Sequence, residues 1–352
     1  MKLFFYFFFL FAFSLVFGQT EIQTFLPNTK VYGITGNKNE IWIATYGKGI
    51  YKYSVKSKRF LNYSTKKNNL QHDMFYCIAE NKNFVWAGSV DGLFIFNKKR
   101  KRWSKRKFGK GGQYSNWIRS LEYDKFSKCL WIGRFKYLSK YDIRTRRFVD
   151  YDLTVGNDEK SNTIKTIKVD GDTLVWFGTE AGMHKYQKAL PFHAKNAVKF
   201  FDNRLNYFNH EGKTVSISDL LFEQNNIWIG LDEFKVKGNE NYNIGGVYCF
   251  NRKNTWKRYD TQNGLNANGV YALEKTGNFI WVSLYQFSPK TKAQFGRGLC
   301  LINRITKKII PILNKKIPDT IYDIYFDGKN IWLGTDRGLI KINLTNKLAS
   351  WN

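Results

Sequence analysis

The chain is poor in the residues that build metal-dependent and cofactor-dependent sites. It has four histidines and four cysteines in 352 residues, and neither set has the spacing of metal ligands. No Cys-x-x-Cys, Gly-x-Ser-x-Gly or His-Glu-x-x-His motif occurs, and the GKGG segment at 109 to 112 lacks the rest of a phosphate-binding loop. We therefore expect no cofactor and no metal. A non-enzymatic function is favoured, although the sequence leaves catalysis open.

The few cysteines also argue against a disulfide framework. Four cysteines in an exported protein are enough for two disulfides. Cys77, Cys249 and Cys300, however, each lie in an apolar strand-like segment, where a free thiol behaves as a small core residue. We expect these three and Cys129 to be unpaired and buried.

Long apolar runs are almost absent. The exception is Leu3 to Phe17, which follows Lys2 and precedes a small-residue cleavage position at Gly18. A membrane anchor is the competing interpretation, since a spanning helix needs only about 17 residues or more. We expect residues 1–18 to be a signal peptide and residues 19–352 to work in the periplasm, at the cell surface or in the medium. No later segment is apolar enough to span a bilayer.

A tryptophan recurs along the whole chain. Seven segments align on Ile, Val or Leu followed by Trp, and the intervals between these tryptophans are 44, 45, 45, 52, 53 and 51 residues. Such a period indicates a repeat architecture. The repeated tryptophans are Trp42, Trp86, Trp131, Trp176, Trp228, Trp281 and Trp332.

Each interval contains four short strand-like segments and no long amphipathic helix. The first is apolar (VYGI, FYCIA, IRSLEY, IKTIKV, ISDLLF, VYALE, IYDIYF), the second carries the tryptophan, and the third often follows glycine. The fourth holds an aromatic residue or an apolar run. A sheet with two apolar faces can bury both of them when several sheets are arranged radially, because each face then packs against a neighbouring sheet. The pattern predicts an all-β fold, a seven-bladed β-propeller of four-stranded antiparallel blades, over residues 19–352.

The repeats resemble the two-component regulator propeller family. The pattern is carried by NGLNANGVYALEKTGNFIWVS in the sixth blade and by DTIYDIYFDGKNIWLGTDRGLIKIN in the seventh. The resemblance covers residues 24 to 352 and implies an exported bacterial propeller, of the kind found in sensors and binding proteins. Either EIQTF or LASWN is expected to supply the outermost strand that closes the ring.

Three blades depart from the repeat. Blade 3 has Arg134 where blades 1, 4 and 7 have threonine, and it lacks the glycine of the following turn. Blades 5 and 6 lengthen the loop after the Trp strand, at 231–246 and 284–298. Long insertions on one face of a repeat protein are where binding usually takes place.

Polar residues precede most first strands. Two positions before each strand lie Thr29, Asp73, Asn116, Asn162, Val215, Asn268 and Asp319, five of which are Asn or Asp. They cap turns or surround the mouth of the channel together with the loops after the Trp strands. We predict that ligand binding involves Asp73, Asn116, Asn162, Asn268, Asp319, Tyr46, Arg134, Lys136, Tyr285 and Arg337.

Acidic residues are scarce. The chain has 28 Asp and Glu against 57 Lys and Arg, a formal charge of +29, and residues 98–147 hold 18 basic residues against Glu122, Asp124 and Asp142. Basic side chains protect an edge strand from aggregation or attract a polyanion, such as an acidic polysaccharide, lipopolysaccharide phosphates or extracellular DNA. The predicted polyanion-binding residues are Lys98, Lys99, Arg100, Lys101, Arg102, Lys105, Arg106 and Lys107. No motif for specific nucleic-acid recognition appears.

The sequence leaves three functions open. The first is an exported binding or scaffold propeller that recognises a protein or glycan partner at its top face, with a basic side on blades 2 and 3. The second is a polysaccharide lyase in which His72, Tyr76 and a channel arginine act on an acidic glycan. The third, ligand sensing in a signalling system, is implied by the family resemblance and is expected to require a separate partner chain.

Overall fold

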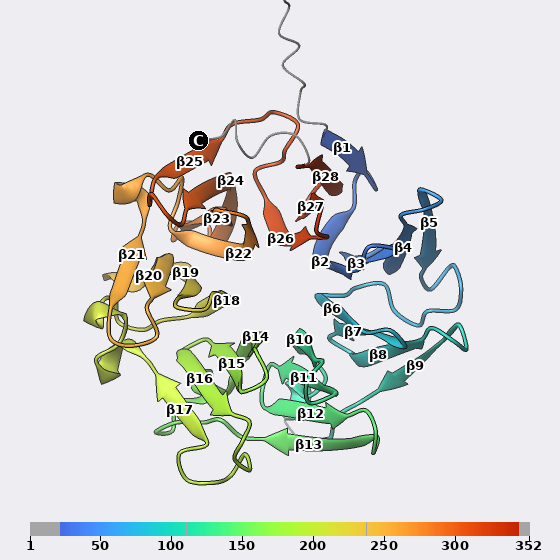
Figure 1. The fold of residues 1–352 in the computed structure, drawn as a ribbon, viewed down its shortest axis with the longest axis horizontal. Coiled ribbons are helices and arrows are strands. Elements are labelled where there is room, and N and C mark those ends of the chain that lie inside the picture. Colours follow the sequence, from blue (N-terminus) through green and yellow to red (C-terminus); the bar gives the residue numbers. More distant parts are fainter. Residues whose placement is uncertain (1–21, 110–111, 237, 345–352) are drawn as a thin grey trace, which may run out of the picture.

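In the computed structural model the chain forms a ring of seven four-stranded antiparallel sheets around a central channel (Figure 1). The structure describes residues 22–109, 112–236 and 238–344. Within these ranges there are 28 strands, five short 3-10 helices and no α-helix. The predicted seven-bladed propeller is therefore confirmed.

In each blade the strands follow one another from the channel outwards (Figure 1). Blade 1 consists of β2 (Lys30–Gly36), β3 (Glu40–Tyr46), β4 (Ile50–Ser54) and β5 (Arg59–Tyr63). Blade 2 consists of β6 (Cys77–Glu80), β7 (Phe84–Ser89), β8 (Gly92–Asn97) and β9 (Arg102–Arg106). Blade 3 consists of β10 (Ile118–Asp124), β11 (Cys129–Arg134), β12 (Leu138–Asp142) and β13 (Arg147–Tyr151).

The second half of the ring repeats this order. Blade 4 consists of β14 (Ile164–Asp170), β15 (Leu174–Thr179), β16 (Gly182–Gln187) and β17 (Val198–Phe201). Blade 5 consists of β18 (Ile217–Phe222), β19 (Ile227–Val236), β20 (Asn239–Phe250) and β21 (Trp256–Tyr259). Blade 6 consists of β22 (Gly269–Thr276), β23 (Phe279–Ser288), β24 (Ala293–Asn303) and β25 (Ile309–Ile312). Blade 7 consists of β26 (Ile321–Phe326), β27 (Asn330–Thr335), β28 (Leu339–Asn343) and β1 (Ile22–Phe25).

The 3-10 helices lie in the connections between strands. They are η1 (Gly112–Tyr114), η2 (Glu159–Asn162), η3 (Asn203–Leu205), η4 (Phe208–His210) and η5 (Thr261–Asn263).

Each repeated tryptophan packs against the blade that follows its own. All seven are at most 2% exposed. The Trp42 ring lies 5.4 Å from Phe96 of blade 2, and the Trp131 ring lies 5.3 Å from Phe177 of blade 4. Because burial of a large aromatic side chain contributes roughly 2–3 kcal/mol, these contacts are a main source of cohesion between neighbouring blades.

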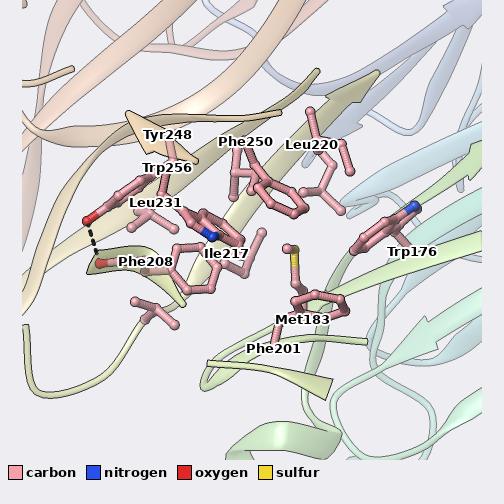
Figure 2. Close-up of a cluster of buried hydrophobic side chains, with 13 residues drawn as sticks. Trp176, Met183, Phe201, Phe208, Ile217, Leu220, Leu231, Tyr248, Phe250 and Trp256 are labelled. Atoms are coloured by element: carbon pink, nitrogen blue, oxygen red, sulfur yellow. Dashed lines mark hydrogen bonds between the residues drawn. The ribbon is translucent and has the colours of Figure 1, made fainter. Parts of the chain in front are cut away.

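The interface between blades 4 and 5 explains one of the longer intervals in the sequence. Figure 2 shows Trp176 and Met183 of blade 4 facing a cluster that includes Phe250 of blade 5. Phe208, from the connection between the two blades, is fully buried in this cluster, and its carbonyl accepts a hydrogen bond of 3.1 Å from the Tyr248 hydroxyl (Figure 2). The extra residues thus add to the core.

The lengthened segments of blades 5 and 6 are strands rather than the loops expected from the sequence. Pairing of β19 with β20 continues through Glu233↔Ile244 and Phe234↔Asn243, and pairing of β23 with β24 continues to Ser288↔Ala293. Alternate side chains in these extensions are buried, so the ladder continues beyond the core of the sheet. Two long hairpins result, which we call hairpin 5 (β19–β20) and hairpin 6 (β23–β24).

The ring is closed by the N-terminal candidate. Strand β1 pairs with β28 from Ile22↔Ile342 to Phe25↔Leu339. The Phe25 ring lies 5.5 Å from Phe60 of blade 1 and 6.3 Å from Trp332 of blade 7. The alternative LASWN and the expected signal peptide lie outside the described residues.

Replacing Phe25 with alanine should weaken the closure of the ring. We expect Phe25→Ala to lower the free energy of unfolding by about 2 kcal/mol, because a half-buried phenyl ring is removed between blades 7 and 1. Denaturant unfolding followed by tryptophan fluorescence measures this change. The control Thr24→Ala alters the exposed position next to it and should change stability by less than about 0.5 kcal/mol. Equal effects of the two variants would contradict the assigned closure.

Candidate functional site

Six inner strands and Tyr76, the residue directly before β6, line a cavity of about 380 Å³ at one end of the channel. Asp232 and Gln294 of hairpins 5 and 6 also line it, so this end is the one from which the hairpins project. We give the name mouth ring to seven of the lining residues, one from each blade. They are Tyr32, Tyr76, Arg119, Lys165, Ser218, Tyr271 and Tyr322.

Four tyrosines make the mouth ring largely aromatic. The rings of Tyr32 and Tyr322 are stacked at 4.4 Å, Tyr271 meets Tyr322 edge-on at 5.5 Å, and Tyr76 lies 6.0 Å from Tyr32. Burial raises the pKa of Tyr76 to about 12 and also raises the pKa values of the other three phenols. These hydroxyls are therefore neutral near pH 7 and can donate hydrogen bonds to a ligand.

Both cations of the mouth ring already have carboxylate partners. Arg119 donates to Glu180 at 2.6 Å, and its guanidinium lies 5.8 Å from the Trp117 ring. Lys165 forms an ion pair with Asp232. Charge at the mouth is therefore balanced, which favours a ligand held by hydrogen bonds and aromatic faces.

Asp232 is the centre of a small network beside the channel. Its carboxylate accepts hydrogen bonds from the Ser216 hydroxyl at 2.6 Å and the Tyr285 hydroxyl at 3.0 Å, besides its contact with Lys165. Burial opposes ionisation of Asp232, but these partners outweigh it and lower its pKa. The network fixes the base of hairpin 5 against blades 4 and 6.

Deeper in the channel, carboxylates link neighbouring blades. The channel cavity that reaches them has a volume of about 420 Å³. Asp219 accepts the backbone N–H of Leu273 at 2.9 Å, and Asp323 accepts that of Ile34 at 2.6 Å. Glu274 accepts the N–H of Phe326 at 3.2 Å. Each bond joins an inner strand to the next blade, so these acidic groups have a structural role.

Several predicted ligand-binding residues cap turns. Four side-chain oxygens accept a backbone N–H from the connection that enters the blade, and these bonds are Thr65 to Asp73 (2.8 Å), Phe108 to Asn116 (2.7 Å), Leu153 to Asn162 (3.0 Å) and Thr261 to Asn268 (3.0 Å). Asp319 accepts the Gly298 N–H through its backbone carbonyl at 2.8 Å. None of these five residues lines the two channel cavities.

The other predicted ligand-binding residues occupy different places. Tyr46 lies beside the mouth ring, 5.6 Å from Tyr32, and Tyr285 lies 4.5 Å from Tyr271. Lys136 pairs with Glu159 at 2.8 Å, and Arg337, 80% exposed in its side chain, lies 3.8 Å from Asp336. Of the predicted residues, only Tyr46 and Tyr285 therefore lie beside the mouth ring, and Tyr285 is fully buried there.

Arg134 is buried inside blade 3, where it takes the place of a hydroxyl that stabilises the corresponding turn in several other blades. In other blades a hydroxyl bonds the carbonyl of the turn glycine, as Thr45 does to Gly49 at 2.6 Å. In blade 3 the guanidinium instead packs over Tyr137 at 5.6 Å and pairs with Asp150 at 3.1 Å. Tyr137 takes the left-handed conformation, with φ at 76°, that glycine takes elsewhere. The departure seen in the sequence is thus accommodated internally.

The predicted polyanion-binding residues are divided between internal and external contacts. Lys98 bridges Glu40 and Glu80, while Lys105 and Lys107 both pair with Asp91. Arg106 packs over Phe148 of blade 3 at 4.7 Å. Within the described ranges, five of these residues are exposed and form no ion pair, and they are Lys99, Arg100, Lys101, Arg102 and Arg106.

The sequence contains a local signal for the mouth ring, although the predicted ligand-binding residues do not include this ring. In each of the seven apolar segments that predict the first strands, the mouth-ring residue lies second, as in VYGI, FYCIA and IRSLEY. A polar or aromatic residue flanked by buried apolar ones marks the strand face that is turned to the channel.

His72 and Tyr76, two of the residues proposed for lyase chemistry, have different surroundings. Tyr76 belongs to the mouth ring, whereas His72 packs against Phe75 at 5.6 Å and Phe94 at 5.9 Å. Among the described residues, none of the four cavities of about 280, 380, 420 and 600 Å³ is lined by both His72 and Tyr76. Burial also lowers the pKa of His72.

The described residues offer few other reactive groups. They contain no cluster of three or more His, Cys, Asp or Glu side chains arranged to hold a metal ion. All four cysteines are unpaired, as predicted, but only Cys129 and Cys300 are buried, while Cys77 and Cys249 are half-buried. No helix in this part of the chain is long and apolar enough to cross a membrane.

Comparison with known proteins identifies the fold. No family model and no curated protein sequence matches the chain. Among solved structures, it is similar to the extracellular domain of a putative one component system from B. thetaiotaomicron, with 19% identity, a TM-score of 0.65 and 94% of this chain covered. The extracellular domain of a putative hybrid two component system from the same organism matches with 18% identity, a TM-score of 0.66 and 92% coverage.

This chain spans about 40% of the length of those two proteins, which are matched over 40% and 42% of their chains. Virginiamycin B lyase from Staphylococcus aureus matches over its whole length and 93% of this chain, with 12% identity and a TM-score of 0.66. The comparisons confirm the propeller that the repeat resemblance implied, and at these identities they establish the fold alone.

The channel carboxylates predict a pH-dependent stability. Burial raises the pKa of Glu122 to about 7 from an ordinary value near 4.5. An acid whose pKa is higher in the folded state than in the unfolded state stabilises the folded state. This contribution to stability is fully present below the pKa of the unfolded state and is lost as the pH rises through the folded-state pKa of about 7. Relative to the wild type, Glu122→Gln should therefore gain about 2 kcal/mol of stability between pH 5 and pH 8, as measured by urea unfolding.

The matched control is Asp172→Asn, at an exposed turn between β14 and β15. Its stability relative to the wild type should not change with pH over this range. A Glu122→Gln difference that is flat with pH would show that the channel does not perturb this carboxyl group.

Proposed function

We propose that this chain is an exported, non-enzymatic binding propeller that holds a glycan at the mouth of its central channel. The observation that carries this proposal is the mouth ring, in which four tyrosines surround a cavity of about 380 Å³. A cavity of this volume is in the range of small-ligand sites. Aromatic faces and neutral hydroxyls together match the apolar faces and hydroxyl groups of a sugar ring.

The balanced charge at the mouth favours a neutral or weakly charged glycan. Arg119 and Lys165 are each paired with a carboxylate, so a strongly anionic ligand would compete with Glu180 and Asp232. The paired carboxylate oxygens remain acceptors for sugar hydroxyls. The ligand is thus expected to bind mainly through hydrogen bonds and stacking.

The hairpins provide a wall beside this site. A further cavity of about 280 Å³ is lined by residues of both hairpins, among them Asp232, Tyr285 and Gln294. Asp232 and Gln294 also line the cavity at the channel mouth. Phe234 on hairpin 5 is 38% exposed, and its ring lies 4.7 Å from Phe287 of hairpin 6. The exposed aromatic surface suits a larger glycan or a protein partner that extends beyond the channel.

A role in ligand sensing is the second candidate. It is supported by the names of the structural neighbours, which are extracellular domains of regulatory systems. The same names and the apolar leader support export to the periplasm, the cell surface or the medium. Sensing requires the binding proposed above, so binding is the property to test first.

Removal of the mouth tyrosines tests the proposal. We expect Tyr76→Ala combined with Tyr322→Ala to weaken binding of a neutral oligosaccharide, identified in a glycan screen, by at least tenfold, because stacking surface is lost on both sides of Tyr32. Isothermal titration calorimetry measures this change. The Tyr76→Phe and Tyr322→Phe pair should retain most of the affinity that comes from stacking.

Phe126→Ala is the control for loss of an exposed aromatic ring elsewhere. Phe126 lies in the turn between β10 and β11, at the opposite end of a blade from the mouth. It should leave binding unchanged. Release of unsaturated products that absorb in the ultraviolet from an acidic glycan, with loss of that activity in His72→Ala, would instead establish a lyase.

A further inference from the structure

A cavity of about 600 Å³ lies along the outer edge of blade 2, and it shares no lining residue with the two channel cavities. Side chains from both faces of the edge strand β9 line it, together with residues of β8 and of the turns that flank blade 2. Arg146, from the turn between β12 and β13 of blade 3, completes the lining. We call this cavity the blade 2 groove.

The groove is lined by cations without any acidic residue. Its charged side chains are Arg100, Arg102, Lys105 and Arg146. Lys105 pairs with Asp91 at 2.5 Å, but the three arginines are exposed and form no ion pair with any residue that the structure describes. Three guanidinium groups therefore remain available, and guanidinium binds carboxylate or sulfate groups through paired hydrogen bonds.

Aromatic and amide side chains lie between these cations. Trp103 is half-buried, with its ring 5.0 Å from Phe96, and Tyr141 is stacked on Phe148 at 4.3 Å. Both are held in place from one side by these neighbours while they line the groove. Asn69 and Gln71 add amide groups from the connection between blades 1 and 2.

We propose that the blade 2 groove binds an acidic polysaccharide. Its carboxylate or sulfate groups pair with Arg100, Arg102 and Arg146, while sugar rings pack against Trp103 and Tyr141. The site is separate from the channel mouth and different in chemistry, because the mouth cations are paired and these arginines are not. The proposal therefore does not depend on the proposed function.

The lining favours a glycan over a nucleic acid. A volume of about 600 Å³ is that of a small-ligand site, which accommodates a few sugar residues and is too small for a duplex. Amide groups also match sugar hydroxyls, and no nucleic-acid recognition motif is present. Single-stranded DNA, which also combines stacking with phosphate charge, is the alternative that the experiment must separate.

The test compares two variants with the same change in net charge. The first is Arg100→Gln, Arg102→Gln and Arg146→Gln together. The control is Lys308→Gln, Lys315→Gln and Lys316→Gln, which neutralises three exposed lysines of blade 6 and the connection after it. Affinities of the full chain for polygalacturonate, heparin oligosaccharides and single-stranded oligonucleotides are measured by calorimetry at low and moderate salt, and far-ultraviolet circular dichroism verifies folding.

The arginine variant should bind at least one of the acidic glycans tenfold or more weakly than the wild type, with a reduced dependence on salt. The lysine control should change affinity less than twofold. Equal losses in both variants would overturn the site in favour of non-specific charge attraction. Tighter binding of single-stranded DNA than of either glycan, or no measurable glycan binding by the wild type, would overturn the assigned ligand class.

Discussion

Burial of one tryptophan per repeat against the following blade is the interaction on which this architecture depends. Without it a four-stranded sheet would leave an apolar face in water. With it each blade becomes the partner of the next, and the ring is complete only when β1 lets blade 7 pack against blade 1. Because every blade has this requirement, the tryptophans recur at nearly regular intervals in the sequence.

The same constraint accounts for part of the basic composition. In four blades a lysine of the third strand lies opposite the tryptophan, with its ammonium group 5.1 to 5.9 Å from the indole ring. These residues are Lys52, Lys140, Lys185 and Lys341, directly paired with Trp42, Trp131, Trp176 and Trp332. Cation–π contacts of this kind contribute about 0.5–1 kcal/mol each. Net charge alone is therefore a poor guide to polyanion binding, whereas unpaired guanidinium groups in one groove are a better one.

The inner strands impose the second constraint, because their channel-facing edges have no neighbouring strand. Asp219, Glu274 and Asp323 accept the N–H groups left there by the next blade. Acidic groups in the channel thus complete the backbone hydrogen bonding of the ring, and they leave the mouth ring above them as the surface that can take a ligand.

The fold was predictable because repeated residues have repeated structural causes. Tryptophan at each blade interface and a hydroxyl or glycine at most turns appear as patterns that one sequence displays several times. The binding surfaces were harder to predict, because they arise from residues that differ between blades. Asp73 and Asn116 look like ligand-binding groups but cap turns, and Arg134 looks like a surface cation but is buried.

Other features could not be predicted from the sequence, because they depend on contacts between distant segments. Nothing local distinguishes a long loop from the strand extensions of hairpins 5 and 6, because their partners lie across the hairpin. Arg146 joins the groove of blade 2 from a different blade, about 40 residues after Arg102. The mouth ring, by contrast, had a local signal, since Tyr32, Tyr76 and Tyr322 occupy the same position in their repeats.

Hydrogen–deuterium exchange with a bound neutral oligosaccharide would show whether a rigid ring presents a ligand site at the channel mouth. We expect slower exchange in hairpins 5 and 6 and in the connections that enter the inner strands at that end, with the outer strands unchanged. Slower exchange confined to the outer strands, or to the turns at the opposite end of the channel, would contradict this expectation.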